Sequence, residues 1–238
     1  MKPQLFHVFR NTPFGRQTLL ESAYFCRTVG VELVVYIPRT NKFLMYFEND
    51  VVQVDLDSSY LISPHTARDH AKSIIVPAGL EPIFFEPKEF TASSLPDIPT
   101  YLDYMCCPRT IADLSSKIGL GYIGSPVRRI VKNARFPVYI PNPVFKEWKN
   151  LAVFFGGSEN ALKALRLGIK LSRLSDFPLL TFTRLEGETR EKYEEIIRKN
   201  RLEEGINNWT VFDGGEFNEN LHEVPHDALV IVGLTVMA

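Results

Sequence analysis

The sequence has little of what marks several classes of protein. It contains only three cysteines, Cys26, Cys106 and Cys107, and no Cys-x-x-Cys spacing, which indicates a reducing compartment and argues against a zinc site. Lysine and arginine form no long basic tract and the formal net charge is -1, so we expect no nucleic-acid partner. The longest apolar run, ALVIVGLTVMA at the C-terminus, has about half the length that a membrane-spanning helix needs.

The N-terminal stretch MKPQLFHVFRN also lacks the apolar core of a signal peptide and leads directly into a strand-like pattern. The chain has 238 residues, of which 45% are hydrophobic, and this is enough for one large or two small cores. We therefore expect a soluble, cytoplasmic, globular protein with no membrane partner.

A repeated pattern divides the chain into two parts. LFHVFRNTPFGRQTLLESAYFCRTVGVELVVYIP, from Leu5, and LAVFFGGSENALKALRLGIKLSRLSDFPLLTFTR, from Leu151, each read as strand, polar turn, helix and strand. Apolar strands that alternate with helices are typical of a parallel sheet covered on both faces. The pattern predicts two such domains, residues 1–145 and 149–238, joined near the prolines of IPNPVFKEWKN.

The two parts differ beyond the repeated segment. In the first, residues 42–57 are predicted to form a hairpin around an Asn49-Asp50 turn, followed by a helix with Ser63 as its N-cap and Pro64 in its first turn. The last helix and a fifth strand, Phe136 to Ile140, come after Gly124-Ser125. The second part has no counterpart of this closing segment, so we interpret it as a truncated copy whose fourth strand is ALVIVG.

In the second part, one helix has a clear apolar face. Ser158 is predicted to be its N-cap. The residues expected to be buried are Ala161, Leu162, Leu165, Ile169 and Leu174.

These segments resemble the universal stress protein family in tandem form. The most specific are LAVFFGGSENALKALRLGIKLSRLSDFPLLTF, GYIGSPVRRIVKNARFPVYIP and PHDALVIVG. The resemblance implies two doubly wound, adenine nucleotide alpha hydrolase-like α/β domains with strand order 3-2-1-4-5, the second truncated. It also implies dimerisation through the fifth strand and, in some members, binding of ATP or AMP.

The residues that bind ATP in this family are only partly present. ATP-binding members carry an aspartate after the first strand, where this chain has Arg10-Asn11-Thr12 in the first part and Gly156 in the second. The family's glycine-rich motif ends in Gly-Ser or Gly-Thr, which Gly124-Ser125 matches. Its two earlier glycines are replaced by Ile111 and Leu114. We therefore interpret the motif as degenerate.

The start of the helix after Gly124 has two interpretations. A helix N-terminus attracts phosphate, but Pro126 removes one N–H group and Ser125 is expected to cap the helix, so we favour a structural role. Val127, Ile130, Val131 and Ala134 are expected to be buried. If a nucleotide binds, the candidate residues are Asn11, Thr12, Arg109, Gly121, Gly124, Ser125 and Arg128.

Other chemical sites have weaker signals. His65 and His70 have the wrong helical spacing for metal ligands, and His222 and His226 fit a solvated turn better than a metal cluster. Cys106 and Cys107 end a buried strand, although a reactive thiol near Arg109 is an alternative. Ser115-Ser116-Lys117 lacks the features of a nucleophile.

Two functional hypotheses remain open. In the first, the protein is a non-catalytic stress-response or regulatory protein that acts through a homodimer or an unidentified protein partner, with no metal and no cofactor. In the second, it binds ATP or AMP in the first domain, or is a slow ATPase. In both, the apolar C-terminal edge strand, including Leu234 and Val236, needs a cover. We expect that cover to come from the hairpin, from Phe136 to Ile140, or from a second copy of the chain.

Overall fold

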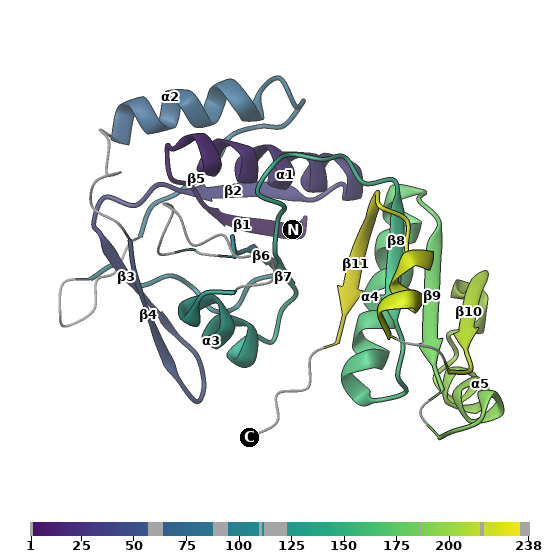
Figure 1. Cartoon of the computed structure of the whole chain (residues 1–238). Coiled ribbons are helices and arrows are strands. Elements are labelled where there is room, and N and C mark those ends of the chain that lie inside the picture. Colours follow the sequence, from purple (N-terminus) through teal and green to yellow (C-terminus); the bar gives the residue numbers. More distant parts are fainter. Residues whose placement is uncertain are drawn as a thin grey trace. The chain divides into compact units, whose positions relative to one another are not determined.

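The computed structural model describes residues 2–56, 64–87, 95–109, 111, 123–185, 187–214 and 217–233. The chain divides into two compact units, Met1–Lys146 and Glu147–Ala238, called here the first and second units (Figure 1). Within the described residues, no helix combines the length and the apolar character needed to cross a membrane.

The first unit contains a five-stranded parallel sheet in the order β5-β2-β1-β6-β7. The strands are β1 (Gln4–Val8), β2 (Glu32–Tyr36), β5 (Ile83–Phe85), β6 (Tyr104–Cys106) and β7 (Val138–Tyr139). The helices are α1 (Pro13–Val29), α2 (Pro64–Ile75) and α3 (Ser125–Asn133). The predicted strand order, 3-2-1-4-5, is confirmed. The fifth strand is shorter than the predicted Phe136 to Ile140, and Ser63 lies outside the described residues.

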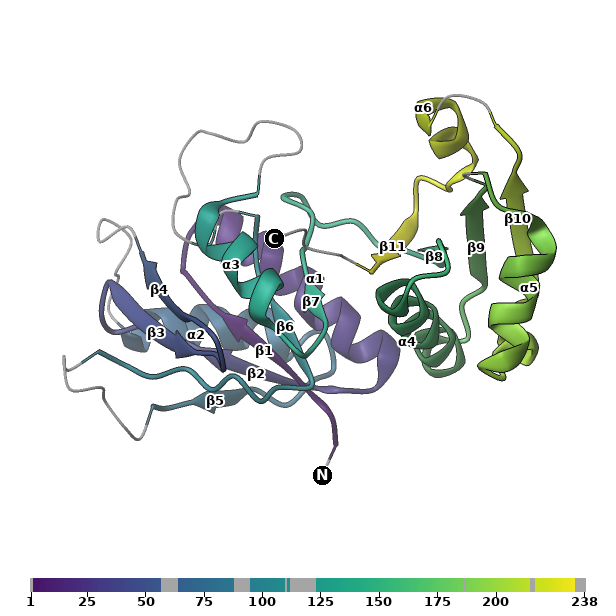
Figure 2. The ribbon, with the colours of Figure 1, turned by 90° about the horizontal axis from the view of Figure 1, so that it is seen from below.

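The two faces of this sheet are covered differently. Helices α1 and α2 lie on one face, and α3 lies on the other together with an antiparallel hairpin, β3 (Lys42–Tyr46) and β4 (Val51–Asp55) (Figures 1 and 2). The alternation of side chains along β1 follows this division. His7 contacts Ser22 of α1, whereas Phe6 and Val8 belong to the core shared with the hairpin.

The hairpin supplies an apolar layer on its face of the sheet. Phe43, Met45, Val52 and Val54 are fully buried in one cluster with residues of the sheet and of α3. Residues 95–98 run beside β3, where the Leu44 N–H donates to Pro96 O at 3.0 Å and the Ile98 N–H donates to Leu44 O at 2.9 Å. No helix occurs among the described residues between β5 and β6.

The second unit contains a four-stranded parallel sheet in the order β10-β9-β8-β11. Its strands are β8 (Asn150–Phe154), β9 (Leu179–Arg184), β10 (Asn208–Phe212) and β11 (Ala228–Val232). Its helices are α4 (Glu159–Ser175), α5 (Arg190–Lys199) and α6 (Phe217–Asn220), with 3-10 turns η2 (Glu203–Gly205) and η3 (Leu221–Glu223).

Helix α4 packs closely on this sheet. Ser158 is its N-cap as predicted, with its hydroxyl accepting from the Ala161 N–H at 3.2 Å. A Cβ atom on Gly168 would lie 2.5 Å from the Val153 side chain, so a glycine is needed where the helix crosses β8. The predicted buried face is confirmed except at its end, because Leu174 is 46% exposed.

Strand β11 is an edge strand within the described part of its sheet. It pairs with β8, and Val230 and Val232 are 47% and 53% exposed. Within the described residues the sheet has four strands, and neither the hairpin nor β7 is one of them. The expectation that one of these two elements covers β11 concerns a contact between the units and stays a prediction. Leu234 and Val236, also expected to belong to the edge, lie outside the described residues.

Candidate functional site

The carboxyl ends of β1 and β6 are the candidate ligand site of the first unit. The sheet order reverses between these two strands, and open α/β sheets bind ligands at such a point. The loop after β1 turns sharply, since the Thr12 N–H donates to Arg10 O at 2.8 Å. Arg10, Asn11 and Thr12 are all at least nine-tenths buried. The loop therefore offers little side-chain surface to a ligand.

Asn11 contacts the two helices beside it. Its Oδ1 accepts a hydrogen bond from Arg16 Nε at 3.1 Å, and its side chain lies within 2.6 to 2.9 Å of His70 Nδ1. The amide of Asn11 thus links α1 to α2. The sequence did not predict the contact with His70, because His70 is 59 residues away and no local pattern connects it to this turn.

Thr12 is the N-cap of α1. Its Oγ1 accepts from the Gly15 N–H at 2.9 Å, and its carbonyl accepts from the Arg16 N–H at 2.9 Å. A capping hydroxyl satisfies a helix donor that would otherwise be unpaired. This use of Thr12 is structural.

The start of α3 differs from the prediction by one residue. Gly124 is the N-cap, since its carbonyl accepts from the Arg128 N–H at 3.0 Å, and Ser125 already belongs to the helix. The prediction that Ser125 caps α3 is therefore wrong: no side chain forms a cap hydrogen bond there. The Gly124 N–H donates to Arg109 O at 2.7 Å. Ser125 is exposed, with Pro126 after it in the first turn.

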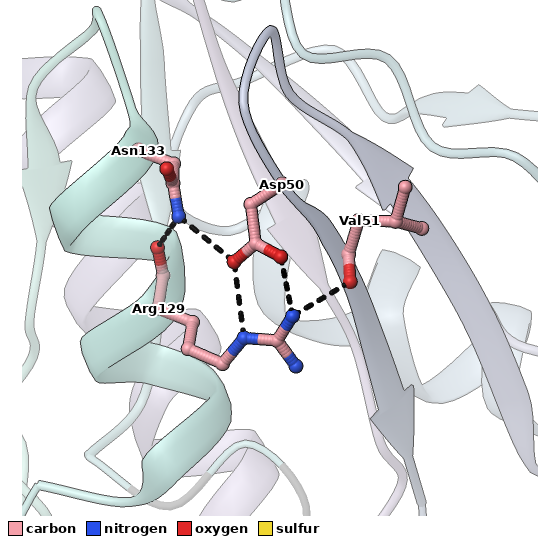
Figure 3. Close-up of polar contacts among 4 residues, drawn as sticks. All are labelled: Asp50, Val51, Arg129 and Asn133. Atoms are coloured by element: carbon pink, nitrogen blue, oxygen red, sulfur yellow. Dashed lines mark hydrogen bonds and ion pairs between the residues drawn. The ribbon is translucent and has the colours of Figure 1, made fainter.

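Arg129 points from α3 toward the hairpin. Its Nε and Nη2 donate to the two carboxylate oxygens of Asp50 at 3.1 and 2.5 Å, and Nη2 also donates to Val51 O (Figure 3). Asn133 Nδ2 donates to Asp50 at 3.1 Å. The Arg129 hydrogen bonds and charge lower the pKa of Asp50. Arg129 therefore fixes the hairpin turn.

Of the remaining candidate residues, some lie at or near the surface and others lie outside the described residues. Arg128 is exposed and Arg109 is half-buried. Gly121 lies outside the described residues, as do Leu114 and Ser115-Ser116-Lys117. Ile111, at a position where the family motif has glycine, is buried in the core of the first unit. Val127 and Ile130 are buried as expected, with Val131 and Ala134 partly buried against them.

The thiols and histidines do not form a reactive centre in the described chain. Burial raises the pKa of Cys106 to about 12 and raises the pKa of Cys107 well above its usual value, so both remain protonated thiols. All three cysteines are free and buried. Among the described residues, no group of three or more His, Cys, Asp or Glu side chains is placed to hold a metal ion.

Of the comparisons with known proteins, only the one with solved structures finds similar proteins. No family model and no curated protein matches the chain. A universal stress protein from Archaeoglobus fulgidus matches with a TM-score of 0.58 at 13% identity, over 92% of this chain and 82% of that one. A putative universal stress protein from Pseudomonas aeruginosa matches with a TM-score of 0.52 at 8% identity, over 90% and 75%.

The chain has the universal stress protein fold. The coverage means that the match extends over both units. A universal stress protein from Archaeoglobus fulgidus in complex with dAMP also matches, at 16% identity over 59% of this chain and 97% of that one. Its TM-score is 0.34, and so low a score gives no argument about ligands of this chain.

Proposed function

We propose that this protein is a non-catalytic regulatory protein of the universal stress protein type, which acts by contact with other proteins. One observation carries the proposal: among the described residues, three polar groups at the carboxyl edge of the first unit form hydrogen bonds within the chain. Asn11 links α1 to α2, Thr12 caps α1, and the Gly124 N–H donates to Arg109 O. A nucleotide that used these three groups would have to break their hydrogen bonds, so we expect nucleotide binding at this edge to be weak or lost.

The contacts that replace nucleotide binding include a second copy of the chain. Edge strands with unpaired N–H and C=O groups tend to associate, and natural proteins often block them with charged side chains. In β11 the outward side chains are valines, with Val230 and Val232 about half exposed. We propose a homodimer through this edge, in the cytoplasm, where buried free thiols such as Cys26 stay reduced.

The alternative function is binding of ATP or AMP by the first unit, with or without slow hydrolysis. The observation in its favour is that the Ser125 hydroxyl is exposed and forms no cap bond, while Arg128 is exposed one turn along α3. A helix N-terminus with these groups attracts phosphate. The missing N–H of Pro126 reduces that attraction.

Isothermal calorimetry and thermal unfolding of the full chain with ATP, ADP or AMP and magnesium decide between the two functions. A ligand that binds only the folded chain raises its melting temperature. We expect no heat of binding and no rise. Binding of ATP that is lost in the double variant Ser125→Ala with Arg128→Gln would overturn the proposal and support the alternative.

A further inference from the structure

A surface groove in the second unit carries an excess of positive charge. It has a volume of about 420 Å³ and lies between α4 and the segment after α5. Its positive side chains are Arg166, Lys170, Arg173 and Arg201, and its negative side chain is Glu204. Four cations against one carboxylate favour an anionic ligand.

Part of the groove lining is apolar. Ile169, Leu174 and Leu202 form this part, and a Cβ atom on Gly205 would lie 2.6 Å from Ile169 Cδ1. The η2 turn therefore rests directly on α4. Leu174 is 46% exposed, although its position on the apolar face of α4 predicted burial. The groove thus combines an aliphatic surface with a positively charged rim.

The arginines on this rim are not neutralised by acidic neighbours. Arg173 and Arg201 take part in none of the ion pairs found among the described residues. Arg166 donates to the side-chain oxygen of Asn200 at 2.6 Å, a neutral partner that leaves the positive charge uncompensated. The charges of these arginines are therefore available to a ligand.

Arg201 occupies an unfavourable backbone conformation. Its φ is 56°, in the left-handed region at the end of α5, where glycine or asparagine is usual. A side chain with a Cβ atom is sterically strained in this region. Backbone strain is common at binding sites, and it makes Arg201 a candidate binding residue.

The spacing of the cations indicates the shape of the ligand. Arg166, Lys170 and Arg173 follow one face of α4 over about 10 Å, from a rise of about 1.5 Å per residue. One phosphate group needs donors that converge on a point, whereas this row fits several negative charges spread along a chain. The lining residues include no aromatic side chain on which a nucleic-acid base could stack.

We propose that this groove binds an acidic protein segment, with carboxylates on the basic rim and an apolar side chain on Leu174 and Ile169. The inference rests on the proposed function and names the chemistry of the partner. Neutralising the helix dipole explains Arg173, in the last turn of α4, but not Arg166, because that effect is confined to the terminal turn.

The groove is separate from the candidate nucleotide site, which belongs to the first unit. Helices that connect parallel strands run opposite to the strands. The C-terminal ends of α4 and α5, where the groove lies, are therefore at the amino ends of the strands. Binding at the groove and nucleotide binding can therefore succeed or fail independently. Nucleotide binding would overturn the proposed function without changing the result for the groove.

Fluorescence anisotropy of a labelled peptide with glutamates around a central leucine tests the proposal on the full chain. We expect binding that salt weakens. Arg173→Gln and Arg201→Gly should each reduce affinity about two- to fivefold, the range for exposed ion pairs. Arg201→Gly should also raise thermal stability, because glycine accepts the left-handed conformation, so its effect on binding is not a folding defect.

Matched controls make the result specific. Lys163→Gln removes an equal charge from an exposed position of the same helix outside the groove and should leave affinity unchanged. Replacing the glutamates of the peptide with glutamine, or its leucine with serine, should weaken binding. The proposal is overturned by an absence of binding at low salt, by equal binding of the glutamine peptide, by an equal effect of Lys163→Gln, or by tighter binding of an oligothymidine.

Discussion

The buried carboxylate of Glu21 in α1 accepts a hydrogen bond of 2.6 Å from the hydroxyl of Tyr139 in β7. Its other oxygen accepts from the Lys146 N–H at 2.8 Å. One side chain thus joins the central helix of the first unit to its last strand and to the end of the unit. Burial raises the pKa of Glu21, although both hydrogen bonds oppose that shift.

Glu21→Gln should change how stability depends on pH. Because the pKa of Glu21 is raised in the folded chain, the unfolded chain loses this proton first, and stability falls as pH rises from about 4.5 to the raised pKa of the folded chain. Glutamine keeps an acceptor for Lys146 without a charge, so urea unfolding of the variant should lack that decline. Glu21→Ala should instead cost about 1–3 kcal/mol at every pH, because buried donors lose their acceptor. Parallel pH curves for wild type and Glu21→Gln would contradict this.

His7 should produce the opposite pH dependence. Burial, with a smaller effect of the Arg10 charge, lowers the pKa of His7 to about 3. The unfolded chain therefore takes up this proton first as pH falls below 6.5, and stability decreases by up to about 1.4 kcal/mol per pH unit.

His7→Asn, which can keep a hydrogen bond to Ser22, should remove that loss, as measured by urea unfolding at several pH values between 6.5 and 4. The exposed His65 provides the control, since His65→Asn should leave the curve as in wild type. An unchanged acid slope in His7→Asn would show that other groups cause it.

Arg129→Gln should loosen the hairpin. The variant loses the paired hydrogen bonds to Asp50, so the pKa of Asp50 should rise toward its usual value in an NMR titration. Hydrogen exchange at the Phe47 N–H, which donates to Asp50 O across the turn, should become faster. Arg128→Gln, at the exposed neighbouring position, should change neither quantity. If both variants behave alike, the ion pair does not hold the turn.

The two serines at helix starts should differ in their effect on stability. Ser158→Ala removes a cap hydrogen bond and should cost about 1 kcal/mol. Ser125→Ala removes none and should stay within about 0.5 kcal/mol of wild type. Urea unfolding measures both, and an equal loss in the two variants would mean that Ser125 acts as a cap in solution.

Val230→Lys with Val232→Lys should abolish the proposed homodimer. Both side chains are exposed on β11, and lysine on an edge strand opposes pairing with another strand. Light scattering coupled to gel filtration should show a dimer for wild type and a monomer for the variant. Val76→Lys, at an exposed apolar position in the first unit, should remain dimeric. A monomeric wild type would refute this assembly.

The sequence alone predicts most of the secondary structure and its order. Alternating apolar strands and amphipathic helices are local patterns, and a parallel sheet results from them because most of the strands are joined to the next through a helix. For the same reason Ser158 could be assigned as a cap, and Asn49-Asp50 as a turn, from a few neighbouring residues.

Tertiary structure decides what the side chains do. His70 lies 59 residues from its partner Asn11, and Asp50 lies 79 residues from its partner Arg129, so only packing brings these pairs together. Packing also leaves Leu174 exposed beside Arg201, since its burial depends on the turn after another helix. Periodicity assigns a residue to one face of its own helix or strand. The cover of that face depends on elements that are distant in sequence, and no local pattern contains that information.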